Sequence, residues 1–205
     1  MKVLITAGPT WVKIDDVRVI TNIFTGGSGI FFGKEFKKKK CAVTLLINSP
    51  YADKLKGIKI IPFRYYDEFK EKVLSQIKNE KYDAIIHTAA VSDYKLKSIF
   101  KGKIPAAKKE LILKLVPAQK VIKSMRGLAK KSVVIQFKLE SKRKGLIDKA
   151  YNRLKENRSD FVVANALEDL KTKYKAFVID KNKKVITVDS KKELFNVLYK
   201  LIKNS

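Results

Sequence analysis

The chain has 205 residues, of which 45% are hydrophobic, which suits one α/β domain with a substantial core and excludes a chain that is disordered throughout. The net charge of +26 would attract polyanions, but the lysines are dispersed from Lys2 to Lys203 without interleaved aromatic residues, which disfavours specific nucleic-acid binding. A lone cysteine, Cys41, excludes an intramolecular disulfide, and no apolar run approaches the roughly 20 residues of a membrane span. Because the N-terminus starts directly in a strand pattern rather than in a signal peptide, we expect a cytoplasmic protein without a membrane partner.

Short apolar runs alternate with helical patterns along the chain. The runs predict strands at residues 3–6, 42–47, 58–61, 84–88, 132–137 and 161–164, and the patterns predict helices at 28–38, 67–78, 117–125, 145–156 and 191–203. Nearly continuous apolar strands separated by helices are typical of a parallel sheet that is covered on both faces. We therefore expect residues 1–205 to form a single Rossmann-like domain, doubly wound around a mainly parallel sheet.

Two segments interrupt this alternation. Residues 111–116 resemble a strand, and the polar stretch 95–109 that leads to them is too long for an ordinary connection, which predicts a functional or mobile segment. Residues 174–180 and 185–188 predict a hairpin with its turn at 181–183.

A glycine-rich loop follows the first predicted strand and opens the first predicted helix. It reads Thr-Gly-Gly-Ser-Gly at 25–29, and Asn22 precedes it. Glycines let the backbone approach an anion, and the free N–H groups of a helix N-terminus point at it. This pattern is a weak signal by itself, but the other motifs also follow predicted parallel strands, whose carboxyl ends share one edge of the sheet.

Several motifs occur in a fixed order along the chain. They are Thr-Ala-Gly-Pro-Thr at 6–10, Asp-x-Val-Arg-x-Ile-Thr-Asn at 15–22, Ala-Ala-Val-Ser-Asp-Tyr at 89–94, Lys-Ile at 103–104, Phe-Lys-Leu-Glu-Ser at 137–141 and Asp-x-x-x-Ala-Asn at 160–165. Together they resemble the phosphopantothenoylcysteine synthetase family. The resemblance implies a Rossmann-like fold with a small β extension that crosses to the partner of a homodimer. It implies nucleotide-dependent ligation of 4'-phosphopantothenate to L-cysteine through an acyl-nucleotide intermediate, with CTP favoured, ATP as the alternative, and Mg²⁺.

The resemblance also implies roles for individual residues. Asn22 and Lys103 would be catalytic, since the family's Asn holds the activated acyl intermediate and its Lys assists nucleotidyl transfer; a cation beside the triphosphate suits that step. Substrate binding is expected of Arg18, Asn22 and Thr25. Nucleotide binding is expected of Gly8, Gly26, Gly29, Ala89, Ala90, Asp93, Phe137, Arg153 and Lys155.

The chain departs from the family pattern in the glycine loop and after Lys103. Ile23, Phe24 and Gly27 replace the family's Arg, Ser and Lys, and Pro105 replaces a lysine. These changes favour, as an alternative, a catalytically weak protein of the same fold that binds nucleotide or phosphopantothenate. A nicotinamide-binding oxidoreductase is disfavoured because no Gly-x-Gly-x-x-Gly follows the first strand.

His87, the only histidine, ends an apolar strand. Without a second histidine or a nearby cysteine it predicts no metal cluster, and a satisfied buried imidazole is favoured over a catalyst.

Overall fold

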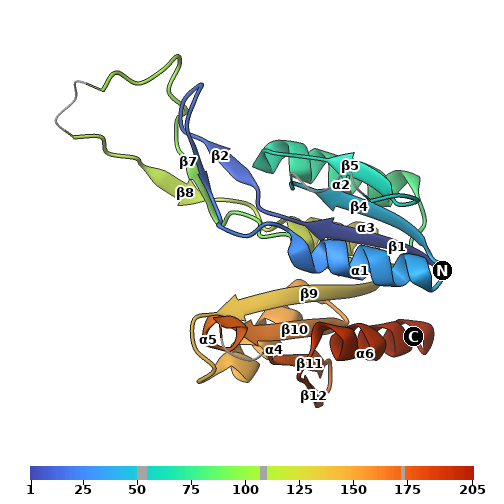
Figure 1. Ribbon diagram of the computed structural model, residues 1–205. Coiled ribbons are helices and arrows are strands. Elements are labelled where there is room, and N and C mark those ends of the chain that lie inside the picture. Colours follow the sequence, from blue (N-terminus) through green and yellow to red (C-terminus); the bar gives the residue numbers. More distant parts are fainter. Residues whose placement is uncertain (50–54, 107–109, 172–173) are drawn as a thin grey trace.

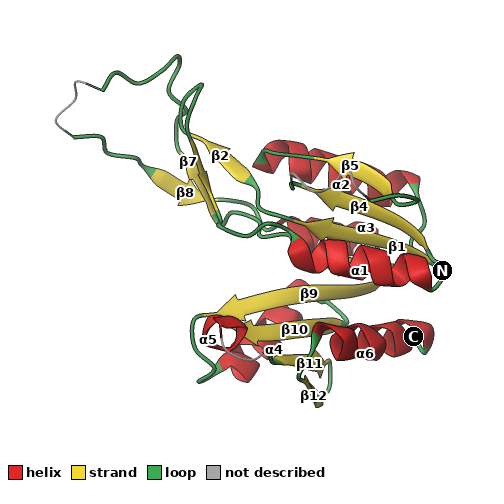
Figure 2. Ribbon diagram, viewed as in Figure 1, coloured by secondary structure: helices red, strands yellow, loops and turns green. Residues whose placement is uncertain are grey.

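The computed structural model describes residues 1–49, 55–106, 110–171 and 174–205. Its centre is an eight-stranded sheet with the strand order β12-β11-β10-β9-β6-β1-β4-β5 (Figures 1 and 2). The strands are β1 (Lys2–Ala7), β4 (Ala42–Ile47), β5 (Lys59–Pro62), β6 (Ala84–His87), β9 (Val133–Glu140), β10 (Phe161–Ala166), β11 (Ala176–Asp180) and β12 (Val185–Val188).

The six strands from β5 to β10 in this order are parallel, and β11 and β12 extend the sheet as an antiparallel hairpin. From β1 the chain first winds outward through β4 to β5, and it then returns to β6 on the other side of β1. The strand order therefore reverses between β1 and β6, and open α/β sheets bind ligands at the carboxyl ends of the strands at such a point. The predicted Rossmann-like, mainly parallel sheet is confirmed.

Helices cover both faces of the sheet (Figure 1). α1 (Gly27–Lys38) and α6 (Lys191–Lys203) pack on one face, where the ring centroids of Phe36 and Phe195 lie 5.0 Å apart. α2 (Tyr66–Asn79), α3 (Val121–Leu128) and α4 (Leu146–Asn157) pack on the other. β1 shows how the sequence specifies this: Val3 and Ile5 lie in the core under α1, and Leu4, which points the other way, lies in the core under α2 and α3.

A β extension projects from the carboxyl edge of the sheet (Figure 1). It consists of two antiparallel pairs, β2 (Trp11–Lys13) with β3 (Val19–Thr21) and β7 (Tyr94–Leu96) with β8 (Leu115–Pro117). A small apolar cluster joins the two pairs; its buried members are Val12, Ile14, Leu96 and Ile104. Residues 107–109 of the polar stretch predicted to be functional or mobile lie outside the described residues.

The predicted element boundaries need two corrections. α3 begins at Val121 rather than at 117, because Pro117 is the last residue of β8 and Ala118 N–H donates to the carbonyl of Asp93 at 2.8 Å. The strand-like run at 111–116 forms a strand only from Leu115. β2, β3, β7 and α5 (Leu167–Lys171) were not predicted, since elements of three to five residues show too little periodicity. The hairpin of β11 and β12 is confirmed. None of the helices in the described parts of the chain has the length and apolar character that a membrane crossing requires.

Candidate functional site

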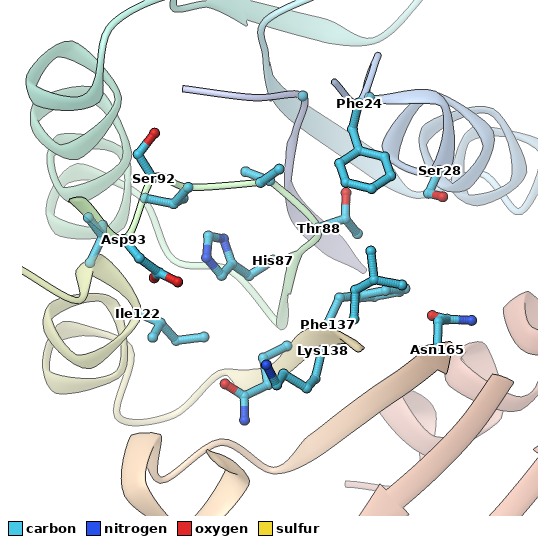
Figure 3. Close-up of a pocket in the computed structure, with 18 of the residues that line it drawn as sticks. Phe24, Ser28, His87, Thr88, Ser92, Asp93, Ile122, Phe137, Lys138 and Asn165 are labelled. Atoms are coloured by element: carbon cyan, nitrogen blue, oxygen red, sulfur yellow. The ribbon is translucent and has the colours of Figure 1, made fainter. Parts of the chain in front are cut away.

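A cavity of about 590 Å³ opens at the carboxyl edge where the strand order reverses. Its wall is assembled from segments far apart in the chain: Gly8 after β1, residues 24–28 at the N-terminus of α1, 87–93 at the end of β6 and beyond it, 119–122 at the start of α3, and 136–139 of β9. Arg153 and Asn157 of α4, together with Asn165, Tyr174 and Lys191, complete it. Figure 3 shows Phe24, Thr88, Asp93, Phe137 and Asn165 facing this space. The prediction that motifs meet at one edge of the sheet is confirmed for those at 6–10, 25–29, 89–94, 137–141 and 160–165, whereas the motif at 103–104 lies outside the cavity wall.

Glycines bring the N-terminus of α1 close to β1. Gly8 has φ 81°, and a Cβ there would lie 2.1 Å from the carbonyl oxygen of Asn48. A Cβ at Gly29 would lie 2.2 Å from the Cβ of Ala7, so the first turn of the helix can pack this tightly only without a side chain. No acidic residue occurs in that turn. The free N–H groups of this helix end therefore face the cavity without a competing carboxylate.

A second, smaller cavity of about 300 Å³ shares residues 91–93 with the first. Asn22 lies in its wall, and its side-chain amide donates to the carbonyl of Ala90 at 2.9 Å. Ala90 N–H in turn donates to the carbonyl of Gly8 at 2.9 Å. Asn22 is thus fixed to the same strand end that separates the two cavities.

Arg18 and Lys103 lie on the extension, in neither cavity wall. The Arg18 guanidinium donates to Asp15 at 2.7 Å and to the carbonyl of Ile104 at 3.2 Å, and Asp15 also accepts the N–H groups of Val17, Arg18 and Ile104. Burial raises the pKa of Asp15, but these hydrogen bonds and the charge of Arg18 outweigh it and bring the pKa to about 2. Lys103 is exposed beside this junction.

The wall of the main cavity is basic. It contains Lys120, Lys138, Arg153 and Lys191, whereas Asp93 is the one acidic residue among its described members. Lys120 pairs with Asp93, and Arg153 pairs with Glu156 at 2.7 Å. Lys120, Lys138 and Lys191 were not predicted as site residues. With 46 lysines and arginines in the chain, composition could not single them out, and Lys120, which directly precedes α3, was predicted to lie inside a helix at 117–125.

Other predicted residues are divided between the cavities and their surroundings. The main cavity is lined by Gly8, Thr25, Gly26, Ala89, Ala90, Asp93, Phe137 and Arg153. Asp93 also lines the second cavity. Gly29 lies behind the wall against β1, and the ammonium of Lys155 lies over the ring of Tyr151, 4.8 Å from its centroid and outside both walls.

His87 lies in the wall of the main cavity, half-buried, with its ring facing Ile122 (Figure 3). Its Nδ1 is 2.7 Å from the hydroxyl of Thr6, and its ring stacks on Phe69 at 6.1 Å. Burial lowers the pKa of His87 to about 4, so the imidazole is neutral at pH 7. Within the described ranges, no group of three or more His, Cys, Asp or Glu residues is placed to hold a metal ion.

The sequence and fold match known proteins. Residues 1–204 match the family described as the DNA/pantothenate metabolism flavoprotein C-terminal domain. The chain is 34% identical over 206 residues to the coenzyme A biosynthesis bifunctional protein CoaBC of Borreliella burgdorferi. The aligned region covers 97% of this chain and 52% of that relative. It therefore spans about half the length of this curated relative.

Two solved structures share the fold. The DNA/pantothenate metabolism flavoprotein from Streptococcus pneumoniae superimposes with a TM-score of 0.86 at 24% identity, covering 100% of this chain and 99% of that one. A Cab2 mutant in complex with phosphopantothenate-cysteine superimposes with a TM-score of 0.82 at 19% identity, covering 99% and 85%. From the match over nearly its whole length, the chain belongs to the family of the DNA/pantothenate metabolism flavoprotein C-terminal domain.

Proposed function

We propose that this protein ligates 4'-phosphopantothenate to L-cysteine at the expense of a nucleoside triphosphate. The observation that carries the proposal is the pair of adjoining cavities at the edge of the sheet where the strand order reverses. One has a basic wall that includes the N-terminus of α1, and the other contains Asn22 in its wall. A triphosphate suits the first cavity by charge. The similarity to bifunctional CoaBC, and the phosphopantothenate-cysteine bound by the Cab2 mutant, support the choice of substrates.

In the first step, the carboxylate of 4'-phosphopantothenate attacks the α-phosphorus and displaces pyrophosphate, which leaves an acyl-nucleotide. The loop at 25–28 and the cations of the wall would hold the phosphate oxygens. Lys103 would stabilise the charge that develops on the transferring phosphorus. Because Lys103 lies outside both cavity walls, this role requires the loop beyond Gly102 to close over the second cavity.

In the second step, the cysteine amine attacks the acyl carbonyl, the nucleoside monophosphate leaves, and the amide forms. Asn22 would hold the acyl-nucleotide between the two cavities, with Arg18 and Thr25 contributing to substrate binding. Arg18 would do so from its place on Asp15 and Ile104 at the base of the extension.

The choice of triphosphate and the role of Mg²⁺ are finer features of the proposal. CTP is favoured over ATP by the family resemblance alone. Mg²⁺ would neutralise part of the triphosphate charge; it keeps several waters and needs only one or two protein carboxylates, which fits a wall with Asp93 as its acidic residue. We place the protein in the cytoplasm as one synthetase domain.

A homodimer is proposed because the extension exposes apolar side chains that a monomer would leave in water. Ile23 is 90% exposed and Ile112 is 75% exposed, and Tyr94, Ile99, Leu111 and Leu115 are also exposed. Several large apolar side chains exposed on one projecting segment are a feature of interaction sites, and a second copy of the chain would cover them.

The alternative is a binding protein of the same fold with weak catalysis. Two observations favour it: Gly27 stands where the family's loop has a lysine, and Lys103 lies away from both cavities. Such a protein would bind triphosphate without turning it over.

Pyrophosphate release separates the two functions. The assay contains 4'-phosphopantothenate, L-cysteine and each of CTP, ATP, GTP and UTP in turn, with 4'-phosphopantothenate omitted as the control. The ligase releases pyrophosphate only when 4'-phosphopantothenate is present, fastest with CTP. If no triphosphate turns over at enzyme concentrations near those of the substrates, the ligase is rejected in favour of the binding protein.

A further inference from the structure

Lysines that are dispersed along the sequence gather on one face of the folded domain. α1 and α6, which pack together on that face, contain seven lysines and two acidic residues. The helices of the other face, α2, α3 and α4, contain eight lysines and arginines together with five acidic residues. Because basic and acidic residues are nearly balanced on one face and not on the other, the α1 and α6 face has the stronger positive field.

The lysines of this face concentrate where both helices end. α1 and α6 begin at the wall of the main cavity, with Ser28 and Lys191, and both end at the opposite edge of the sheet (Figure 1). There the ammonium groups of Lys39 and Lys203 both lie over the ring of Tyr199, 5.7 and 5.9 Å from its centroid. The exposed lysines of this edge, named the lysine patch below, are Lys37, Lys38, Lys39, Lys40, Lys200 and Lys203.

The lysine patch is poorly neutralised by its own protein. Lys38 pairs with Glu35 at 2.6 Å, and the other five lysines form no ion pair with a described residue. Glu35 is itself shared with Lys192. Lysines in the last turn of a helix ordinarily offset the macrodipole, but that amounts to only about half a negative charge at each C-terminus. Two helices therefore account for about one of the six positive charges.

A ligand with closely spaced negative charges would complement the lysine patch. Duplex nucleic acid carries one negative charge per about 1.7 Å of its axis. An anionic membrane also attracts lysines, but helices that lie in its surface insert large apolar side chains. Among the described residues, no large apolar side chain that is exposed belongs to α1 or α6; Phe36, Phe195 and Leu198 are all in the core. Charge without an apolar anchor favours nucleic acid.

We propose that the lysine patch binds the phosphate backbone of double-stranded nucleic acid without reading its sequence. Lysine is a compact point charge that contacts phosphates well and lacks the planar fork with which arginine reads a guanine edge. Since both helices place the patch at the edge of the sheet away from the cavities, a duplex can bind there without covering the proposed active site.

The test compares two variants of equal net charge. Lys37→Gln/Lys39→Gln/Lys40→Gln/Lys203→Gln removes four charges of the patch and spares the pair of Lys38 with Glu35. Fluorescence anisotropy with a labelled random-sequence duplex DNA, at salt concentrations between about 50 and 200 mM, gives the affinity and its salt dependence. We expect the affinity at about 0.1 M salt to fall by about a hundredfold or more, and the slope of log K against log salt to shrink by about three to four.

The matched control removes four lysines that are exposed and unpaired among the described residues but lie outside the patch. It is Lys78→Gln/Lys81→Gln/Lys123→Gln/Lys184→Gln. This variant has the same net charge as the patch variant, and we expect its duplex affinity to stay within about threefold of the wild type. Thermal unfolding of both variants should match the wild type, because all the changed side chains are exposed.

Three outcomes would overturn the inference. Equal losses in the two variants would assign binding to net charge rather than to the patch. A wild type that does not bind the duplex at about 50 mM salt, or that prefers one sequence strongly, would exclude a sequence-independent backbone site. Vesicles of anionic lipid that bind through the patch while the duplex does not would make the face a membrane surface instead. Pyrophosphate release should be the same in the wild type and the patch variant, so the proposed function is tested separately.

Discussion

The central sheet and the β extension are stabilised in different ways. In the sheet, every strand from β5 to β12 has neighbours in register, and large apolar clusters bury both faces. In the extension, short paired strands share a small cluster of Val12, Ile14, Leu96 and Ile104, and the carboxylate of Asp15 accepts several of the hydrogen bonds that join its loops.

The predicted functions divide along the same line. The residues expected to bind nucleotide lie mainly at the carboxyl edge of the sheet, whereas Lys103, proposed to be catalytic, and Arg18, proposed to bind substrate, lie on the extension. A rigid sheet can hold the triphosphate in place, while a weakly held extension can change position during the reaction. The comparison therefore predicts that changes in the sheet alter binding and stability, and that changes in the extension alter catalysis.

The largest effect is expected for Lys103→Gln. Removing this cation should lower acyl-nucleotide formation by roughly a hundredfold or more, because it acts mainly while charge develops on the α-phosphorus. The affinity for CTP and the free energy of unfolding should stay the same, since Lys103 is exposed and outside the cavity wall. Single-turnover measurements with CTP labelled at the α-phosphate report the step directly.

Lys101→Gln is the matched control for Lys103→Gln, since it removes an exposed lysine two residues away in the same loop. Equal rates for Lys103→Gln and Lys101→Gln would show that the chemistry does not use Lys103.

Gly29→Ala should produce the next largest effect. Its new Cβ would lie 2.2 Å from the Cβ of Ala7 and 3.2 Å from the hydroxyl of Thr88, so α1 must move away from β1. Overpacking of this kind costs about 1–3 kcal/mol in the free energy of unfolding, measurable by urea denaturation. Triphosphate binding should weaken as well, because the helix N-terminus moves with α1.

Gly27→Ala serves as the control for Gly29→Ala. The nearest atom to its Cβ is the Thr25 hydroxyl at 3.8 Å, an ordinary contact, so the helix need not shift. A Gly29→Ala protein as stable as Gly27→Ala would mean that α1 does not pack on β1 as the structure has it.

The sheet could be predicted from the sequence and the extension mostly could not. Val3, Leu4 and Ile5 belong to a run of apolar residues between helical patterns, and this redundancy survives small errors at element ends. The strand Trp11–Lys13 is too short to show the alternation of apolar and polar residues that marks a strand. The segment between it and its partner β3 does not carry one of the dipeptides that mark a tight hairpin turn. The polar stretch 95–109 and the strand-like run 111–116 showed that the alternation is interrupted, but only the resemblance to a family indicated a β extension.

The candidate site was predictable where a backbone requirement showed in the residue type. Gly8 and Gly26 have positive φ angles, a backbone conformation that favours glycine, so the residue type itself pointed to these turns. Gln136 and Asn157 carry no such mark, because an amide buried in a cavity looks like any other amide until the neighbouring strand and helix bring the two together. Lys120 and Lys138 were hidden by the abundance of lysine.

His87→Gln should alter how the stability of the sheet responds to pH. The pKa of His87 is lowered from 6.5 to about 4, so between these values the unfolded chain binds more protons than the folded one. Stability from this residue is complete above pH 6.5 and is lost as the pH falls toward 4, with a slope of at most about 1.4 kcal/mol per pH unit. Urea denaturation between about pH 4.5 and 7.5 should show that the free energy of unfolding depends less steeply on pH in the variant than in the wild type. Since no other histidine occurs in the chain, an unchanged slope would assign the pH response to carboxylates instead.

The smallest effect on global stability is expected for Asp15→Asn, because it acts on the extension alone. The amide nitrogen that replaces one carboxylate oxygen would face the donors Ile104 N–H and Arg18, so the loop carrying Lys103 should detach from the loop at 15–18. Hydrogen exchange at the Ile104 amide should become faster while the amides of β1 and β6 keep their protection.

In the wild type, the lowered pKa of Asp15 means that its carboxylate stabilises the extension above the ordinary aspartate pKa, and that this stabilisation is lost as the pH falls toward about 2. Asp16→Asn removes an exposed pair with Lys13 at 2.8 Å and a carboxylate that interacts with the backbone of Gly102, but it keeps the hydrogen bond from Ile104 to Asp15, so it should leave the Ile104 amide protected. Faster exchange throughout β1 in Asp15→Asn would show instead that sheet and extension unfold as one unit, and the distinction between a rigid binding edge and a movable catalytic arm would not hold.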